Sequence, residues 1–377
     1  MNLAVRDIRH NLGRFLLTCV GLSLLLGIVL SMIAIYRGLV AEALTVSRVA
    51  GADVWVVEAR TRGPFAESSR LPDDTRAAIA SLWGVAGAGS VVYQTVEATH
   101  DGRTLRLQVI GIETDRPGRP PAVVAGRPIM RSRYEAIADR RTGLVLGERI
   151  TLGRDVFRVV GLTDGIVASG GDPVIFITLR DAQVLQSELA PPAARRELAR
   201  GAASGATGTV NAVVVDLQAG VSPEAFASEV RRWKHLSALT QAEQETVLTR
   251  SVVERARRQI GLFTALLMVV STVIITLIIY TLTIDKKKSI ATLKLIGAPD
   301  TTIVGLILQQ ALAMGAIGFV AGSLMIHAVK DYFPRRLVLE AADAVTLFVI
   351  VMLACVLASG LGIRTALRID PATALAG

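Results

Sequence analysis

The stretch Lys286–Gly297, which reads KKKSIATLKLIG, lies between two long apolar runs and decides the fold of this 377-residue chain. A short basic segment between two membrane spans lies at a membrane face, and basic residues favour the cytoplasmic face. Ile290, Leu293 and Ile296 recur at spacings of three, which is typical of a helix with one apolar face. Gly297 is a suitable C-cap for that helix. We therefore expect a short amphipathic helix on the cytoplasmic side, where it can receive force from a soluble partner.

Four apolar runs are long enough to cross a bilayer, which takes about 20 residues. A signal peptide is the alternative reading of the first run. The length of that run, and the lack of a clean small-residue cleavage pattern after it, argue against a signal peptide. The runs are Phe15–Ile35, Gly261–Ile284, Thr302–Val329 and Ala344–Ile363.

The basic residues orient these spans. They precede the first span, separate the second from the third and follow the fourth, whereas the loop between the third and fourth mixes both signs. The positive-inside rule then places both termini and the Lys286–Asp300 loop in the cytoplasm, and the long segment between the first two spans outside it. The residues that carry this argument are Arg6, Arg9, Arg14, Lys286, Lys287, Lys288, Lys294, Arg364 and Arg368.

Composition excludes several classes of function. The chain is 51% hydrophobic and carries a net charge of +9, but its basic residues gather at the ends of apolar runs without interleaved aromatics, so we expect no nucleic-acid partner. Cys19 and Cys355 both lie inside apolar runs, so no disulfide is expected in the extramembrane part. The four histidines are scattered, which gives no pattern for a metal site.

The segment before the first span has its own pattern. Leu3, Val5, Ile8, Leu12 and Phe15 share one helical face, while the basic residues lie largely elsewhere. This pattern predicts an amphipathic helix in the inner membrane interface over residues 1–14. The alternative is a helical extension of the first span.

The large segment after the first span mixes strand and helix patterns. Val91–Thr99 and Thr104–Ile112 are β-rich runs joined through Asp101-Gly102, which is a strong hairpin signal. Pro191–Gly208 is rich in Ala, Gly, Pro and Arg and is the best candidate for a mobile loop. From about Ala242 the pattern is helical up to the second span, which predicts one continuous stalk helix. Two helices split near Arg257 are the alternative.

The spans carry packing signals rather than chemistry. Gly318-x-x-x-Gly322 in the third span, with Gly315 one turn earlier, predicts close helix approach, and Gly27 and Ser31 predict the same in the first span. Mid-membrane Asp, Glu, Lys and Arg are absent from all four runs, which argues against a proton-coupled transporter or ion pump. The sequence also lacks Walker A, His-Glu-x-x-His and Gly-x-Ser-x-Gly motifs, so we do not expect an enzyme.

Two segments identify a family. KKKSIATLKLIGAPDTTIVGLILQQALAMGAIGFVAG (286–322) and LRIDPATALAG (367–377) resemble the MacB/FtsX-type ABC transporter permeases, with a lean to the DevC-like and haemin-exporter-like branch. The resemblance covers the whole architecture and is weakest across the outer domain. It implies an α-helical membrane protein of the bacterial inner membrane, with four transmembrane helices and an α+β extracytoplasmic domain between the first and second spans.

The resemblance also implies partners. Permeases of this type pair with a separate cytoplasmic ABC ATPase, which binds the ATP and Mg²⁺, so this chain needs no cofactor of its own. We expect a second copy of the chain as a homodimer partner, a periplasmic adaptor as a further partner, and contact with membrane lipid. The family's coupling helix corresponds here to Lys287, Lys288, Ser289, Ile290, Ala291, Leu293, Lys294 and Gly297. The family usually has an acidic residue where this chain has Ser289, which removes the basis for a salt bridge there.

Three functions are compatible with this pattern. An export permease would move a lipid, glycolipid or other hydrophobic substrate by mechanotransmission, in which ATP-driven closure moves the stalk and the outer domain. A signalling permease of the FtsX kind would regulate an envelope partner without transport. An enzyme or receptor whose outer domain acts alone is the third. The expected domains are 1–14 (interfacial helix), 15–36 (first span), 37–240 (extracytoplasmic domain), 241–260 (stalk), 261–284 (second span), 285–300 (coupling loop), 301–329 (third span), 330–343 (outer loop), 344–363 (fourth span) and 364–377 (tail).

Overall fold

The computed structural model describes residues 12–100, 102–120, 122–191, 208–333 and 337–368. The chain divides into two compact units, each described here by itself. The helical unit comprises residues 1–38 and 256–377, and the sheet domain comprises residues 39–255. Nearly all of the predicted interfacial helix, most of the predicted mobile loop and most of the tail lie outside the described residues.

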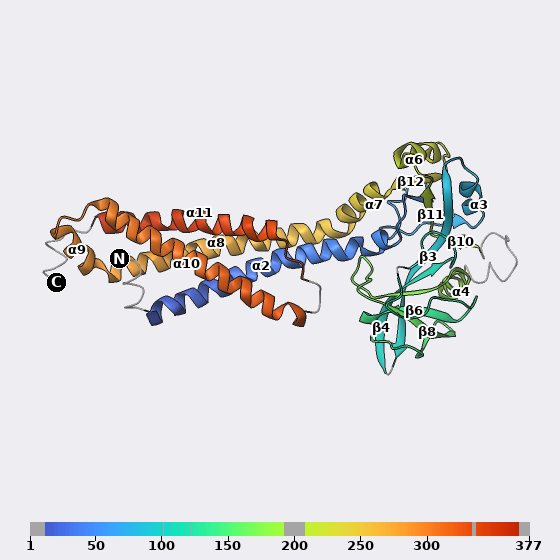
Figure 1. Ribbon diagram of the computed structural model, residues 1–377, viewed down its shortest axis with the longest axis horizontal. Helices are drawn as coiled ribbons and strands as arrows, with labels where there is room; N and C mark the ends of the chain where they lie inside the picture. The colour runs from blue at the N-terminus through green and yellow to red at the C-terminus, as the bar shows by residue number, and fades with distance from the viewer. Residues whose placement is uncertain (1–11, 101, 121, 192–207, 334–336, 369–377) are drawn as a thin grey trace. The chain divides into compact units, whose positions relative to one another are not determined.

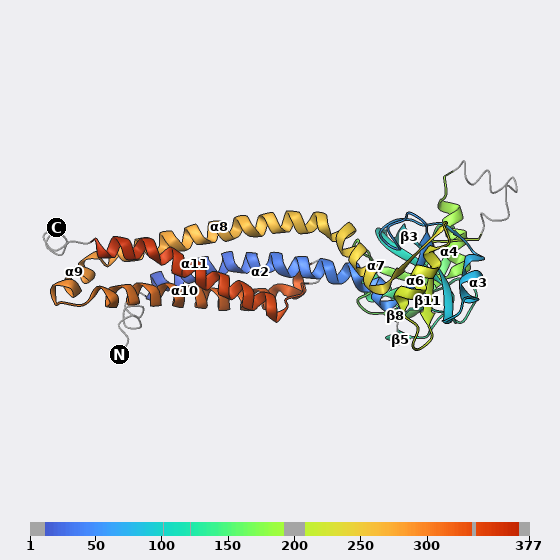
Figure 2. The same ribbon diagram turned by 90° about the horizontal axis from the view of Figure 1, so that it is seen from above.

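The helical unit is built from α2 (Leu12–Val49), α8 (Glu254–Asp285), α10 (Asp300–Val329) and α11 (Ala341–Leu367), with α2 and α8 each continuing into the sheet domain. All four helices are long and apolar enough to cross a membrane, and the four predicted spans lie within them. Figures 1 and 2 show α2 crossing α10. The core of the unit forms where apolar stripes meet, as at Leu22, Leu26 and Leu30 of α2. In the most apolar stretch of α8 only 17% is buried within the protein, against 33–39% in the other three helices. Of the four helices, α8 therefore leaves the widest apolar face uncovered by the rest of the protein.

The two ends of the helical unit are fixed by polar contacts. At the end where α2 leaves for the sheet domain, the Arg37 guanidinium donates from Nε and Nη2 to the two carboxylate oxygens of Asp343 at 2.6 and 2.8 Å. Beside this pair, the Val338 amide donates to the Ala34 carbonyl at 3.2 Å. The segment before α11 is thereby tied to the first span. The opposite end carries α9 (Lys287–Leu295) between α8 and α10.

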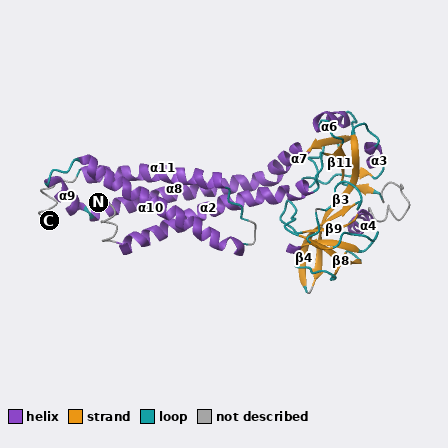
Figure 3. Cartoon of the chain, in the orientation of Figure 1, coloured by secondary structure: helices purple, strands orange, loops and turns teal. Residues whose placement is uncertain are grey.

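Over its described residues, the sheet domain combines short helices with one ten-stranded sheet and a two-stranded sheet in which β2 pairs with β10 (Figure 3). The helices are α3 (Thr75–Ala80), α4 (Leu179–Leu189), α6 (Pro223–Arg231) and α7 (Gln241–Leu248), with a 3₁₀ turn at Arg140–Thr142. The strands are β1 (Val54–Glu58), β2 (Leu71–Pro72), β3 (Val85–His100), β4 (Arg103–Ile112), β5 (Ala125–Gly126), β6 (Glu135–Asp139), β7 (Arg149–Leu152), β8 (Asp155–Thr163), β9 (Val174–Thr178), β10 (Thr209–Val210), β11 (Ala212–Leu217) and β12 (Leu236–Thr240).

The sheet runs in the order β12-β1-β11-β3-β4-β9-β6-β8-β5, and β7 pairs with β8. The predicted hairpin is confirmed: β3 and β4 pair from Val91↔Ile112 to His100↔Arg103. Two pairs, β4–β9 and β6–β8, are parallel, so segments far apart in the chain must cross over to meet. Alternate residues of β1 enter two different cores, Val54 in one and Trp55 in the other, because both faces of the sheet are covered.

The predicted stalk is helical throughout, but it is not one α-helix. Thr240 and Glu243 form a capping box that starts α7, which places the N-terminus firmly at Gln241. The α-helical pattern then gives way to a π-helical turn at Thr249–Val253 before α8 begins at Glu254. A π turn holds one residue more than an α turn and weakens the local hydrogen-bond ladder. The break therefore lies one to two turns before Arg257, where the alternative placed it.

Within the sheet domain, α7 is fastened to the last turns of α2. The Arg48 guanidinium donates from Nε and Nη2 to the Glu245 carboxylate at 2.9 and 2.8 Å. Ser47 Oγ donates to Gln241 Oε1 at 3.3 Å, and the buried Trp55 indole donates to the same oxygen at 3.0 Å. The Arg48 guanidinium lowers the pKa of Glu245. The two helices are thus held together where both connect to the sheet.

Candidate functional site

The helix predicted from KKKSIATLKLIG forms, as α9, and its C-terminus has a complete Schellman motif. The Ala298 amide donates to the Leu293 carbonyl at 3.0 Å, and the Gly297 amide donates to the Lys294 carbonyl at 3.1 Å. Gly297 has φ +88°, which costs glycine little and strains other residues. These contacts end α9 abruptly and turn the chain into α10.

One face of α9 is buried in the helical unit. Ile290 and Ala291 are 4% and 0% exposed and belong to the same core as α2, α10 and α11. Lys286 Nζ donates to Gln310 Oε1 of α10 at 3.0 Å, and Lys294 Nζ donates to the Leu367 carbonyl at the end of α11 at 2.8 Å. These contacts fix α9 to the ends of its neighbours, so α9 and the helical unit can move as one piece.

The opposite face of α9 is open. Lys287, Lys288, Ser289 and Gly297 are exposed, while Leu293 and Lys294 are half-buried. The eight predicted coupling residues therefore separate into two groups. Six present at least part of their surface, and two, Ile290 and Ala291, hold the helix in place.

Two exposed residues were missing from the predicted set. Leu295 is 61% exposed and Ile296 is 79% exposed, although both are large and apolar. The spacing of three residues predicted Ile296 on the same face as Ile290, and that prediction is wrong. On a helix with 3.6 residues per turn, a residue three positions further along lies about 60° around the helix axis from the first. Ile296, six positions after Ile290, therefore points in a direction about 120° away from that of Ile290. An exposed apolar pair beside lysines is typical of a contact surface rather than of a solvated helix end.

The second predicted set, the small residues of the spans, lies where helices approach closely. A methyl group added at Gly322 would lie 2.7 Å from the Ser23 carbonyl oxygen and 3.1 Å from the Gly27 nitrogen, so only glycine fits the crossing of α2 and α10. At Gly318 an added Cβ would meet the Leu22 side chain at 3.0 Å. Gly315 faces α11 instead, where the added atom would lie 2.5 Å from Cys355 Sγ.

The remaining member, Ser31, is half-buried on α2. One packing glycine was missed, although Ala358-x-x-x-Gly362-x-x-x-Ala366 has the small-x-x-x-small spacing. A Cβ on Gly362 of α11 would lie 2.9 Å from Ile279 Cγ2 and 3.0 Å from Thr283 Oγ1 of α8. Only the structure shows which helix α11 faces at that position.

Among the described residues, no group of three or more His, Cys, Asp or Glu could hold a metal ion. The site geometry centres on α9, which is held to its neighbours on one face and open on the other, and on glycine-lined helix crossings.

Comparisons with known proteins agree with this architecture. The model of the FtsX-like permease C-terminal family matches residues 261–371, and that of the MacB-like periplasmic core domain matches residues 15–233, which is more than half of the chain. An uncharacterised ABC transporter permease of Mycobacterium tuberculosis is 25% identical over 99% of this chain and 99% of its own length. An uncharacterised ABC transporter permease of Mycobacterium bovis is 23% identical over 99% of both chains.

Two solved structures are similar to part of the chain. The periplasmic region of MacB from Actinobacillus actinomycetemcomitans aligns with 53% of this chain and 95% of its own, with 8% identity and a TM-score of 0.37. The extracellular domain of the ABC-type transporter YknZ from Gram-positive bacteria aligns with 49% and 100%, with 10% identity and a TM-score of 0.32. At these scores the structural likeness adds nothing to the family matches.

Proposed function

Because this chain belongs to the MacB/FtsX-type ABC transporter permeases, we propose that it couples ATP hydrolysis in a separate cytoplasmic ATPase to movement of its extracytoplasmic domain. The chain is a membrane protein with four apolar helices and a sheet-rich extracytoplasmic domain between the first and second. As the permease subunit of an ABC transporter, it works with an ATPase partner.

The observation that carries the proposal is the split surface of α9. Its inner face is locked to α10 and α11 through buried Ile290 and the Lys286–Gln310 hydrogen bond. Its outer face offers Lys287, Lys288 and the apolar Ile296 to solvent. A partner that grips the outer face can push on the spans without bending α9, because the Schellman motif and the buried contacts hold its geometry.

The same proposal implies the other partners of this chain. ATP and Mg²⁺ bind in the ATPase, and this chain supplies neither a nucleotide site nor a catalytic residue. A second copy of the chain completes a homodimer, so that two α9 helices meet two ATPase subunits. The assembly lies in the bacterial inner membrane with both termini in the cytoplasm, since lysines gather on the α9 side. A periplasmic adaptor and membrane lipid are further partners in this proposal, which also places the chain in the DevC-like branch of the family.

Movement reaches the sheet domain through α2 and α8. Each of these helices continues from the helical unit into the sheet domain, so a displacement of either helix is passed on along the chain. The Arg48–Glu245 pair couples α2 to α7. This arrangement favours mechanotransmission, and we propose that the moved substrate is a lipid, a glycolipid or another hydrophobic compound.

A signalling permease that regulates an envelope partner is the second candidate, because the same α9 and stalk would serve it equally well. The two differ in their response to cargo. Substrate-stimulated ATP hydrolysis by the reconstituted complex supports transport. Hydrolysis that responds only to an envelope protein supports signalling.

The experiment that tests the proposal is an affinity pull-down of the full chain from its native membrane in mild detergent, with mass spectrometry of the retained proteins. A stoichiometric subunit with Walker motifs is the expected result. Folded chain that retains no ATPase would overturn the assignment of α9 as the docking helix.

A further inference from the structure

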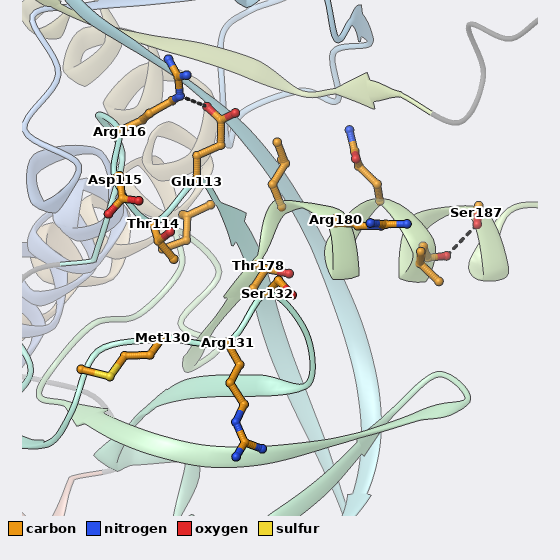
Figure 4. A pocket seen from close by; sticks show the side chains of 14 residues that line it. Glu113, Thr114, Asp115, Arg116, Met130, Arg131, Ser132, Thr178, Arg180 and Ser187 are labelled. Carbon is orange, nitrogen blue, oxygen red and sulfur yellow. Dashed lines mark hydrogen bonds and ion pairs between the residues drawn. The ribbon is translucent and has the colours of Figure 1, made fainter.

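The sheet domain has an open hollow of about 710 Å³ beside the first turns of α4. Figure 4 shows its three walls: α4 with Arg180 and Ser187, the segment Glu113–Arg116 after β4, and Met130 with Arg131 before β6. Most of the side chains in the hollow are polar, and three of them are arginines.

A second hollow of about 870 Å³ adjoins the first and shares part of its wall, including Ile112 and Met130. Apolar side chains, among them Val123, Ile129 and Ile137, line it together with Thr114, Asp115 and Arg119, so its surface is about equally polar and apolar. Met130 stands between the two hollows and is 72% exposed. An exposed methionine is a flexible, polarisable contact for apolar ligands of irregular shape.

The walls are built rigidly, and carboxylates hold them. Glu135 is 4% exposed and accepts hydrogen bonds from the Met130 amide at 2.9 Å and the Arg131 amide at 3.0 Å. The Arg127 guanidinium donates to Glu135 at 2.6 and 3.1 Å and, together with those amides, lowers the pKa of Glu135 to about 2. The Met130–Arg131 wall is therefore fixed before any ligand arrives.

The other two walls are held in the same way. Buried Asp181 of α4 accepts from the Tyr134 amide at 2.9 Å and from Arg133 Nε at 3.1 Å, which ties α4 to the segment before β6. Glu113 accepts from the Ser90 amide at 3.1 Å. The loop after Glu113 packs so tightly on β3 that a Cβ at Gly89 would collide with the Pro117 carbonyl oxygen.

The charge that remains in the first hollow is positive. Glu113 is already paired with Arg76 and Arg116, at 3.6 Å each, which leaves Asp115 as the acidic lining residue without a described partner. Against it stands Arg180, which is exposed and has no partner among the described residues. Arg131, on the other wall, points away from Arg180 (Figure 4) and contacts Glu135 at 3.7 Å. Arginines with free donors favour planar or tetrahedral anions.

We propose that the adjoining hollows bind an anionic amphiphile, with its phosphate or carboxylate near Arg180 and its apolar part along Met130 and Val123. The volume of each hollow lies in the range of small-molecule sites, and the walls are preformed. The two hollows together are called the groove. That the groove binds such a ligand does not depend on the transport function proposed above, but that the ligand is transported cargo does. The combination of fixed walls, Arg180 without a described partner and an adjoining hollow with apolar lining residues is what selects the ligand class.

The test uses the full chain in phosphatidylcholine nanodiscs and a long-chain alkyl phosphate that carries a photoreactive group at the end of its chain. After illumination, mass spectrometry locates the labelled peptides. We expect labelling of the peptide that contains Val123 and Met130, competed by unlabelled alkyl phosphate but not by inorganic phosphate or an uncharged alkyl maltoside. Binding is read without any ATPase, so it is independent of coupling.

Arg180→Glu should reduce groove labelling about tenfold, since it removes a charged hydrogen-bond donor and adds repulsion. Arg103→Glu is the matched control, because Arg103 is exposed on the same domain and lines neither hollow. Thermal unfolding confirms that the variants are folded. Labelling confined to the membrane helices, or unchanged by Arg180→Glu, would overturn the proposal. Full competition by inorganic phosphate would show that the apolar part of the ligand does not contribute to binding, and would overturn that part of the proposal. Groove labelling in a chain that retains no ATPase would leave this site standing and refute the proposed function.

Discussion

Gly27 of α2 and Gly322 of α10 touch through their backbones: a methyl group on Gly322 would lie 3.5 Å from the Gly27 Cα and 3.1 Å from its nitrogen. The contact leaves no room for a side chain on α10 at this level. The first and third spans therefore cross at a point set by two glycines.

Gly322→Ala should destabilise the helical unit by about 1–3 kcal/mol, because the new methyl group meets the Ser23 carbonyl and forces the backbones apart. Thermal unfolding of the purified chain in detergent measures the loss. Gly305→Ala is the matched control in the same helix, since nothing lies within 4 Å of a Cβ there. Equal melting temperatures for the two variants would mean that α2 and α10 do not pack through Gly322.

Gly318→Leu tests the same crossing one turn earlier. The larger side chain meets Leu22 of α2, so the yield of folded protein should fall without selective loss of ATPase binding. Pull-down of the ATPase, normalised to folded chain, separates the two effects. A folded Gly318→Leu protein that fails to retain the ATPase would contradict this expectation.

Ile296→Asp should weaken ATPase retention about tenfold or more while leaving the melting temperature within a degree or two of the wild type, because Ile296 is exposed. Ile290→Asp is the comparison: it buries a charge among α2, α10 and α11 and should lower the stability of the protein itself.

Leu293→Asp and Gly297→Pro should both uncouple ATP hydrolysis from function. The first acts through the half-buried side chain, and the second through loss of the Gly297 amide donor. Full coupled activity in all three surface variants would show that the partner binds elsewhere.

Glu135 should make the sheet domain sensitive to acid. Its folded pKa of about 2 lies below the ordinary value of 4.5, so its contribution to stability is complete above pH 4.5 and is lost as the pH falls towards 2. Glu135→Gln should cost about 2 kcal/mol at neutral pH, because it removes the charged acceptor of two amides and Arg127. Unfolding of wild type and variant compared between pH 7 and pH 3 checks both statements. A stability difference that did not shrink on acidification would argue against an ionised Glu135.

The π turn at Thr249–Val253 should open more readily than the α-helices on either side. Its hydrogen-bond ladder is irregular, and local opening is faster where fewer regular bonds must break. Amide hydrogen exchange of the full chain should show faster exchange over these residues than over α7. Deletion of Arg250, which restores the α-helical count, should abolish the difference. Exchange as slow as in α7 would show that this turn is rigid.

Local patterns in the sequence were sufficient for the membrane helices, α9 and the β3–β4 hairpin. Each of these elements is specified by residues close in the chain, such as the Asp101-Gly102 turn signal or the Gly297 cap. The first predicted span, Phe15–Ile35, lies within α2, and α2 itself continues to Val49, where its last turns pack in the sheet domain through the Arg48–Glu245 pair.

Contacts between distant segments could not be predicted in the same way. Nothing near Glu135 in the sequence shows that β6 lies beside β9 on one side and β8 on the other. The groove depends on those pairings, since its walls come from three separate parts of the chain. The exposure of Ile296 was also missed, because spacings of three look helical without revealing where the helix stops.

The contact between Ser47 and Gln241 joins residues 194 positions apart. The sheet domain thus leaves and rejoins the rest of the chain through neighbouring segments. A domain with adjacent ends can be exchanged for another by recombination without changing the length of either junction. In evolution, such a chain can keep its membrane helices and acquire a different extracytoplasmic domain, so relatives with similar spans need not bind similar molecules.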